Sequence, residues 1–264
     1  MNLELNMSDK QLVARAPSVG QTQPHRTCSD KYSFISTLDI VDGMRADGWR
    51  AIDARQNRVY YSDKGGFQKH LVEMIHPDHM YKDLAIRACI VNAHDRTTRY
   101  SLFLGAITFV CTNGLISGEI LEGLTLRHIN QSSEGVVQAS QELSRKIEIL
   151  TEAIKRFKKV TLSELEQAAF AEAVLGFLYK QRDGKVLAPI TSDQLLSARH
   201  EEQKVPTLWN ILNRVQENII QGGLSGRSVR SGHRMTTKGI SAISSDVAIN
   251  RKLWELSETM SLKA

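Results

Sequence analysis

The chain has 264 residues, of which 41% are hydrophobic and 24% are charged, with 17 Gly and 5 Pro. This composition is that of an ordinary globular protein, and it excludes a collagen-like chain and a wholly disordered one. No run approaches the roughly 18 consecutive apolar residues of a membrane-spanning helix, so we do not expect this chain to be an integral membrane protein. Residues 1–18 mix acids and bases without an apolar segment, which is not the pattern of a secretory signal.

The three cysteines, Cys28, Cys89 and Cys111, lie far apart and form no Cys-x-x-Cys pair. An odd number of widely spaced cysteines is typical of a protein of the reducing cytoplasm, and we expect no disulfide framework. Cys89 and Cys111 lie within apolar runs, and we expect both side chains to be buried and inert.

The formal net charge is +5, but the positive charge is concentrated in one part of the chain. Residues 204–252 contain eight Lys and Arg against two acidic residues, so the remainder is close to neutral. A local positive field of this kind favours a polyanion as partner. The alternative is a solvated basic surface without a partner.

The first half of the chain has the pattern of a β-meander. Residues 1–30 are polar without a sustained period, so we expect a flexible N-terminal arm with at most a short helix near 9–14. The segment 37–48 has apolar residues at helical spacing and ends at Gly48, which predicts a short amphipathic helix. Strand-like runs follow at 49–59, 67–75, 84–92 and 100–111 and around 125–128, with turn residues between them. Consecutive strands joined by short turns predict an antiparallel sheet.

The second half has helical spacing of its apolar residues. A capping box, Ser163 with Glu166, marks the start of one of these helices. The predicted helices span 133–159, 163–180, 192–198, 207–221 and 244–261. The basic, glycine-rich segment 222–239 separates the last two, and we expect a flexible loop there.

These elements predict an α+β fold in three parts. Residues 1–30 form the arm, 31–160 an α+β core in which an antiparallel β-meander is followed by a long helix, and 161–264 a helical C-terminal region with the basic loop 222–239. A sheet of consecutive strands backed by one long helix is similar to the core of Rad52-like single-strand annealing proteins. Those proteins form rings or filaments and hold the phosphates of a strand in a basic groove.

The basic loop is the sharpest candidate for a binding site. Arg227, Arg230, Arg234 and Lys238 recur every three or four residues and are separated mainly by Ser, Thr and Gly. Phosphate contacts need Arg and Lys side chains and free backbone N–H groups, and Gly permits a close approach. The alternative is a disordered surface loop between helices. No Gly-Lys-Ser/Thr follows four spacer residues, so the segment is not a P-loop and we expect no nucleotide hydrolysis.

A second basic candidate lies in the turn that follows the strand predicted at 84–92. Arg96 and Arg99 in this turn are expected to assist in contacting phosphates. The neighbouring His94-Asp95 pair has the residue types of a catalytic or metal-binding fragment. Asp in a turn more often hydrogen-bonds the local backbone, and we expect that role here.

We predict no metal site, cofactor site or catalytic centre. His70, His76 and His79 match no zinc-site spacing, and no paired cysteines accompany them. The sequence contains neither a Gly-x-Ser-x-Gly elbow nor a dinucleotide-binding fingerprint. We therefore expect a binding protein rather than an enzyme.

Five aromatic residues bear on whether bases are stacked. Trp209 and Trp254 lie on predicted amphipathic helices, where packing in the core is favoured over base stacking. Tyr60, Tyr61 and Phe67 flank the first predicted hairpin, where a single-strand platform and an edge within an oligomer fit equally well.

Five stretches spread from about residue 30 to 260 carry a resemblance to a known family. They are YSFIST at 32–37, VNAHD at 91–95, FVCTNGL at 109–115 with Gly118, VQENIIQGGLSG at 215–226, and Asp246 with Asn250, Arg251, Leu253 and Trp254. In these stretches the chain resembles an uncharacterised phage/plasmid-like family of prophage, plasmid and phage proteins, which share domain of unknown function 932. The resemblance implies a mobile-element origin and a place in the cytoplasm of the bacterial host, and it identifies no catalytic residue. Such proteins often accompany recombination, anti-restriction and single-strand-binding functions.

Two functions are consistent with these expectations. The first is a phage- or plasmid-encoded nucleic-acid-binding protein that binds or anneals single-stranded DNA without ATP in recombination or replication. It would act as a homo-oligomer away from membranes, and its affinity would fall with salt. The residues assigned to the contacts are Arg227, Arg230, Arg234 and Lys238, assisted by Arg96 and Arg99. The alternative is a host-takeover or anti-defence protein that inhibits a host DNA-acting protein, with the basic loop against an acidic protein surface.

Overall fold

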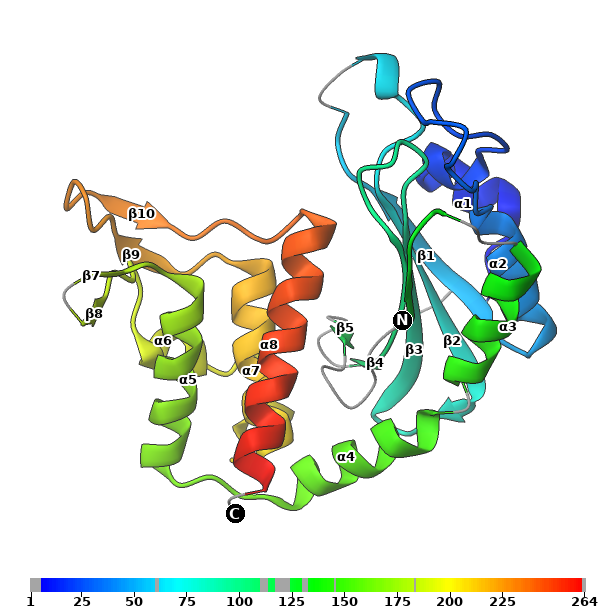
Figure 1. Ribbon diagram of the computed structural model, residues 1–264. Helices are drawn as coiled ribbons and strands as arrows, with labels where there is room; N and C mark the ends of the chain where they lie inside the picture. Colours follow the sequence, from blue (N-terminus) through cyan, green and yellow to red (C-terminus); the bar gives the residue numbers. More distant parts are fainter. Residues whose placement is uncertain are drawn as a thin grey trace. The chain divides into compact units, whose positions relative to one another are not determined.

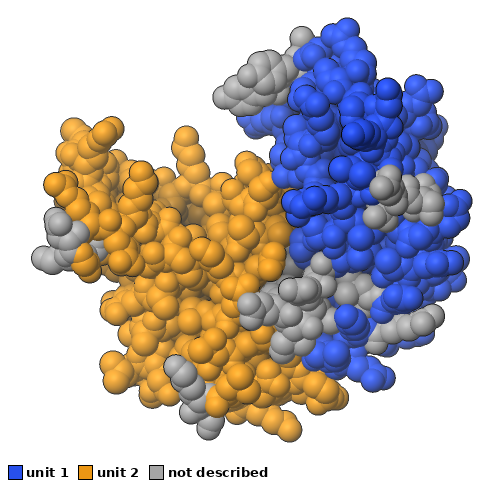
Figure 2. All heavy atoms as spheres, viewed as in Figure 1, with its two compact units in different colours: residues 1–109, 119–150 blue, residues 110–118, 151–264 orange. Residues whose placement is uncertain are grey.

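The computed structural model describes residues 6–59, 62–109, 114–116, 124–129, 133–144, 146–182 and 184–262. The chain divides into two compact units, which Figure 2 shows in different colours. Unit 1 comprises residues 1–109 and 119–150, and unit 2 comprises residues 110–118 and 151–264. The division falls inside helix α4 (Ile147–Lys159), earlier than the boundary after residue 160 that the sequence predicts.

Unit 1 is built on an antiparallel sheet (Figure 1). Its strands are β1 (Arg50–Gln56), β2 (His70–Met80), β3 (Leu84–Asn92), β4 (Tyr100–Thr108) and β6 (Leu124–Leu126). The first four lie side by side in chain order, and β6 pairs with β4. Every residue of β3 and β4 is buried, as expected of apolar runs without alternation. The predicted α+β class and antiparallel meander are therefore confirmed.

Helices α2 (Thr37–Ala46) and α3 (Ser133–Ser144) pack against each other, α2 beside β1 and α3 beside β4. Gly48, which follows α2, has a φ of 91°. This left-handed conformation ends the helix as the sequence predicts. The hydroxyl groups of Tyr100 and Ser140 lie 2.8 Å apart and join β4 to α3 inside the core.

Residues 6–30 belong to the fold of unit 1, which corrects the expectation of a flexible N-terminal arm. They contain α1 (Asp9–Arg15) and the 3-10 helix η1 (Pro17–Gly20). Leu12 and Val19 are fully buried, and the Met7 amide donates to the Ala51 carbonyl of β1 at 2.7 Å. The apolar residues of this segment are too sparse to give a period, yet Met7, Leu12, Ala16 and Val19 are all buried.

Unit 2 is mainly helical (Figure 1). Beyond the second part of α4 it contains α5 (Glu164–Leu178), α6 (Ser192–Leu196), the 3-10 helix η4 (Glu201–Lys204), α7 (Leu208–Gln221), α8 (Ile243–Ser261) and the short strand β5 (Gly114–Ile116). It also contains two small hairpins, β7 (Gln181–Arg182) with β8 (Lys185–Val186), and β9 (Ser225–Arg227) with β10 (Arg234–Thr236). No described helix is both long and apolar enough to cross a membrane.

The core of unit 2 contains the two tryptophans that the sequence places on helices. Trp209 and Trp254 are buried, and the Trp254 ring lies 5.0 Å from the ring of Phe157. Their predicted packing role is confirmed. The capping box is also present, because Ser163 Oγ accepts from the Glu166 amide while the Glu166 carboxylate accepts from the Ser163 amide.

The single helix predicted at 133–159 is two helices, α3 and α4. The apolar spacing runs through the interruption, from Leu143 to Ile147 and Leu150, so the sequence pattern gives no sign of it. The two pieces serve different units, because α3 packs on α2 whereas α4 continues into unit 2.

Candidate nucleic-acid interface

The basic segment 222–239 forms an ordered hairpin, which corrects the expectation of a flexible loop. Its strands β9 and β10 pair antiparallel, with Arg227 directly opposite Arg234. The pairing continues toward the helices, where the Gly223 amide donates to the Thr237 carbonyl at 2.9 Å. The four candidate side chains of this segment are therefore carried by a defined backbone.

Three glycines allow the hairpin to pack on its own unit. A Cβ on Gly226 would lie 2.1 Å from the carbonyl oxygen of Pro189, and Cβ atoms on Gly222 and Gly239 would lie within 2.9 Å of backbone atoms. The Arg227 amide also donates to the Pro189 carbonyl at 3.0 Å. These glycines thus serve contacts within unit 2, which is why a glycine-rich segment is ordered here.

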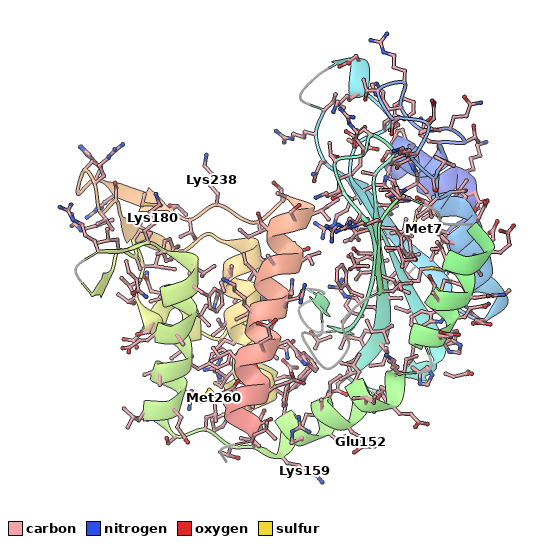
Figure 3. The ribbon with its side chains drawn as sticks, in the orientation of Figure 1. Met7, Glu152, Lys159, Lys180, Lys238 and Met260 are labelled. Carbon is pink, nitrogen blue, oxygen red and sulfur yellow. The ribbon has the colours of Figure 1, made fainter. Side chains whose placement is uncertain are left out.

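The hairpin carries positive charge that the described residues leave unneutralised. Arg227, Arg230, Arg234 and Lys238 are all exposed. None of the four forms an ion pair within the described part of the chain. Figure 3 shows the Lys238 side chain pointing away from the helices of unit 2. An anionic ligand would meet these charges without displacing an internal carboxylate.

An open groove of about 660 Å³ lies beside the hairpin. Arg227 and Arg234 line it from the strands, Thr191 lines it as the N-cap of α6, and Gln194 lines it from within α6. The Gln194 amide is fixed in place, because its Nε2 donates to the Ser225 carbonyl at 2.6 Å. The groove therefore combines two cationic side chains with neutral hydrogen-bonding groups, the combination that backbone contacts to nucleic acid use.

The other two predicted contacts lie in unit 1. Arg96 and Arg99 occupy the turn between β3 and β4, and both are exposed. Arg96 has a φ of 60°, a left-handed conformation that is uncommon for a residue other than glycine. The structure thus brings four of the six predicted residues together on one hairpin and places the remaining two on a turn of the other unit.

Asp95 has the structural role that the sequence predicts for it. Its Oδ1 accepts from the Thr97 amide at 3.1 Å and from the Thr97 hydroxyl at 2.5 Å. Its Oδ2 lies 3.5 Å from Lys64 Nζ. The carboxylate therefore closes the β3–β4 turn, and it is not positioned against the ring of His94 as a catalytic pair would require.

A buried polar cluster lies at the end of the sheet from which this turn leaves, and sequence reasoning missed it. Thr37 Oγ1, at the start of α2, lies 2.8 Å from His70 Nε2 and 3.5 Å from His94 Nε2. Asn92 Nδ2 donates to the same hydroxyl at 3.1 Å. The rings of His70 and His94 have centroids 5.0 Å apart.

His128, which follows β6, extends this cluster. The ring of Tyr32 stacks on it, with centroids 4.7 Å apart and an interplanar angle of 7°. The stretches 32–37 and 91–95, two of those that carry the family resemblance, therefore meet around these histidines. Neither stretch alone signals the cluster, because 32–37 contains no histidine and His70 and His128 lie outside both stretches.

The histidines of the cluster are neutral at pH 7. Burial lowers the pKa of His70 to about 4. The pKa of His94 is lowered to about 3, mainly by burial and to a smaller extent by the neighbouring His70 and His128. Nδ1 of His94 and Nε2 of His128 are buried and have no hydrogen-bond partner among the described residues. Burial also raises the pKa of the Cys28 thiol, so this nearby cysteine is not an activated nucleophile.

The remaining candidates occupy ordinary surroundings. His76 and His79 have ring centroids 5.1 Å apart, and His76 Nε2 lies 2.9 Å from the Asp47 carbonyl oxygen. No group of three or more His, Cys, Asp and Glu within the described ranges is arranged to hold a metal ion. Phe67 packs edge-on against His25, with centroids 5.1 Å apart.

Four residues named from the sequence lie outside the described part of the chain, namely Tyr60, Tyr61, Cys111 and Gly118. Cys89, in contrast, is buried in β3, as the sequence predicts. The single-strand platform suggested for the first hairpin therefore stays a prediction.

Comparison with known proteins places the chain among uncharacterised relatives. A family model described as Domain of unknown function (DUF932) matches residues 24–254. The UPF0380 protein YfjQ of Escherichia coli (strain K12) is 29% identical over 254 residues, which cover 96% of this chain and 91% of the relative. The UPF0380 protein YafZ of the same organism is 28% identical over the same shares of both chains. No solved structure matches the chain significantly. The match over most of its length shows that this chain belongs to the family defined by that domain of unknown function.

Proposed function

We propose that the chain is a phage- or plasmid-encoded protein that binds single-stranded DNA and acts in recombination or replication without ATP. It works by binding rather than by catalysis, in the cytoplasm of the bacterial host. The observation that carries the proposal is the β9–β10 hairpin, on which four exposed cations lie without ion-pair partners among the described residues. Phosphates of a nucleic-acid backbone are the natural partners of such a surface.

A single strand suits this hairpin better than a duplex does. The four cations lie within twelve residues on a narrow two-stranded element. A flexible strand can bend around such an element and bring several phosphates to it, whereas a stiff duplex meets it on one side only. The proposed annealing role is based on the antiparallel meander alone, because the single long helix of a Rad52-like layout is here two helices, α3 and α4. The proposal includes a homo-oligomeric state, which light scattering coupled to size-exclusion chromatography would measure.

The test is fluorescence-anisotropy binding to labelled 30-nucleotide single strands and matched duplexes. The variant changes Arg227, Arg230, Arg234 and Lys238 to Ala. The matched control changes four exposed lysines outside the basic stretch 204–252 to Ala, namely Lys10, Lys31, Lys82 and Lys146. Both variants lose four positive charges, so they separate a local site from the effect of net charge.

We expect the wild-type protein to prefer the single strand, the hairpin variant to bind at least tenfold more weakly, and the control to stay within about threefold. Equal losses in both variants would show that binding depends only on overall charge. If no strand binds even at low salt, the proposal is wrong. A stoichiometric complex with an acidic host protein, lost in the hairpin variant, would then point to the inhibitor function instead.

A further inference from the structure

Unit 1 contains a pocket of about 310 Å³ beside the β3–β4 turn. It is formed by two connections, the one between β1 and β2, which includes the 3-10 helix η2 (Ser62–Lys64), and the turn between β3 and β4. The side chains on which the argument rests are Arg58, Lys64, Gln68, Lys69, Asp95 and Thr97. Its volume is at the lower end of the range for sites that take a small ligand.

The charge of the pocket is positive. Among the described residues, three cations, Arg58, Lys64 and Lys69, line it together with one carboxylate, Asp95. Asp63 lies next to Lys64 in the chain, but it is exposed and does not line the pocket. An anion in the pocket would therefore meet an excess of positive charge from groups close enough to act together.

Asp95 organises this pocket and does not cancel its charge. Both oxygens of its buried carboxylate are engaged, Oδ1 by Thr97 and Oδ2 by Lys64. The Lys64 ammonium lies 3.5 Å from Oδ2, a long distance for an ion pair, and it has three N–H donors. Asp95 thus holds the Lys64 side chain at the pocket wall with donors left for a ligand.

Partial burial makes the cations receptive to an anion. Lys64 and Lys69 are half-buried. Burial lowers the pKa of Lys69, because its ammonium has lost part of its hydration. Gln68 is buried and fixed, since its Oε1 accepts from the Gly66 amide at 2.8 Å. A doubly charged, compact anion gains most from such a wall of point charges.

We propose that this pocket binds the terminal phosphoryl group of a phosphomonoester, with Lys64 and Lys69 contacting the phosphate and Arg58 at the pocket mouth. The ligand is either a free mononucleotide or the 5′-phosphorylated end of a strand, and the chemistry of recognition is the same for both. The site does not depend on the β9–β10 hairpin, and it adds a second anion-binding place to the chain.

The test uses isothermal titration calorimetry of the full chain with three probes, adenosine monophosphate, inorganic phosphate and adenosine. Anisotropy with 12-nucleotide strands that carry either a 5′-phosphate or a 5′-hydroxyl supplies the second arm. The variants are Lys64→Gln and Lys69→Gln, and the control is Lys82→Gln, an exposed lysine of the same unit that does not line the pocket. Thermal unfolding of each variant shows whether the fold is intact.

We expect the phosphorylated probes to bind and adenosine not to bind, with about a tenfold loss in each pocket variant and none in the control. Binding of adenosine monophosphate would identify the free nucleotide as the source. Preference for the 5′-phosphorylated strand alone, lost in Lys64→Gln, would identify the strand end. Equal binding of phosphorylated and unphosphorylated probes, or equal loss in the control, would overturn the proposal. Because the hairpin variant keeps this pocket, phosphomonoester binding by that variant separates failure of one site from failure of the other.

Discussion

Arg227 and Arg234 lie directly opposite each other on the paired strands β9 and β10. Directly opposed like charges destabilise an antiparallel pair by a few tenths of a kcal/mol to about 1 kcal/mol. The hairpin therefore contains a repulsion that the fold of unit 2 does not require. If the proposed phosphate contacts are made here, a phosphate bound between the two guanidinium groups would relieve this repulsion.

Replacing Arg234 with Gln should stabilise the protein while weakening strand binding. The substitution keeps the length of the side chain and removes the cross-strand repulsion, so the free energy of unfolding should rise by about 0.2–1 kcal/mol. Urea denaturation measures this change. Arg230→Gln is the control, since Arg230 lies in the turn that connects the two strands and has no cross-strand partner in the β9–β10 register. An equal change in both variants would contradict the account.

Gly226→Ala should displace the hairpin. The new Cβ would lie 2.1 Å from the Pro189 carbonyl oxygen, which is a backbone atom and cannot move aside cheaply. We expect a loss of about 1–3 kcal/mol in the free energy of unfolding and faster amide exchange across β9 and β10. Gly176→Ala in α5 is the control, because its Cβ would make only an ordinary contact at 3.6 Å to Gln181 Nε2. If amide exchange in β9 and β10 is unchanged in the Gly226 variant, the close contact with Pro189 is not what orders the hairpin.

The buried histidines should make stability depend on pH. His70 has a pKa of about 4 in the folded chain and about 6.5 when unfolded, so between these values the unfolded chain binds a proton that the folded chain does not. The free energy of unfolding therefore falls as the pH drops through this window, by up to about 1.4 kcal/mol per pH unit for this histidine. His94, with a pKa of about 3, adds to the same slope.

Urea unfolding at pH 7.0, 6.0 and 5.5 measures this slope. His70→Gln should flatten it whatever that substitution does to stability at pH 7. The control is His233→Gln, because His233 is exposed in the turn between β9 and β10. A slope that His70→Gln leaves unchanged would contradict the assignment.

Local sequence patterns predicted the elements whose residues are close together in the chain. The run at 84–92 matches β3 to the residue, and Ser163 caps α5 together with Glu166, as the capping box predicts. Buried strands and capped helices leave local patterns of this kind. The hairpin at 222–239 leaves no such local pattern. It is ordered because its glycines allow close contact with residues distant in sequence, such as Pro189.

The candidate site, too, could be predicted from the sequence only in part. The spacing of Arg227, Arg230, Arg234 and Lys238 predicted that these residues act together, and they share one hairpin. The histidine cluster joins residues from four separate segments, at positions 37, 70, 92–94 and 128, so no window of sequence contains it. The pocket around Asp95 likewise depends on two connections that only the sheet brings together.

The salt dependence of single-strand binding tests the central claim most directly. The logarithm of the binding constant falls linearly with the logarithm of the salt concentration, with a slope near −0.7 for each phosphate contact on a single strand. If the four cations of the hairpin contact phosphates, their joint replacement by Ala should make the slope less negative by roughly 3. The four-lysine control should keep the wild-type slope. An unchanged slope in the hairpin variant, or the same flattening in the control, would contradict the account.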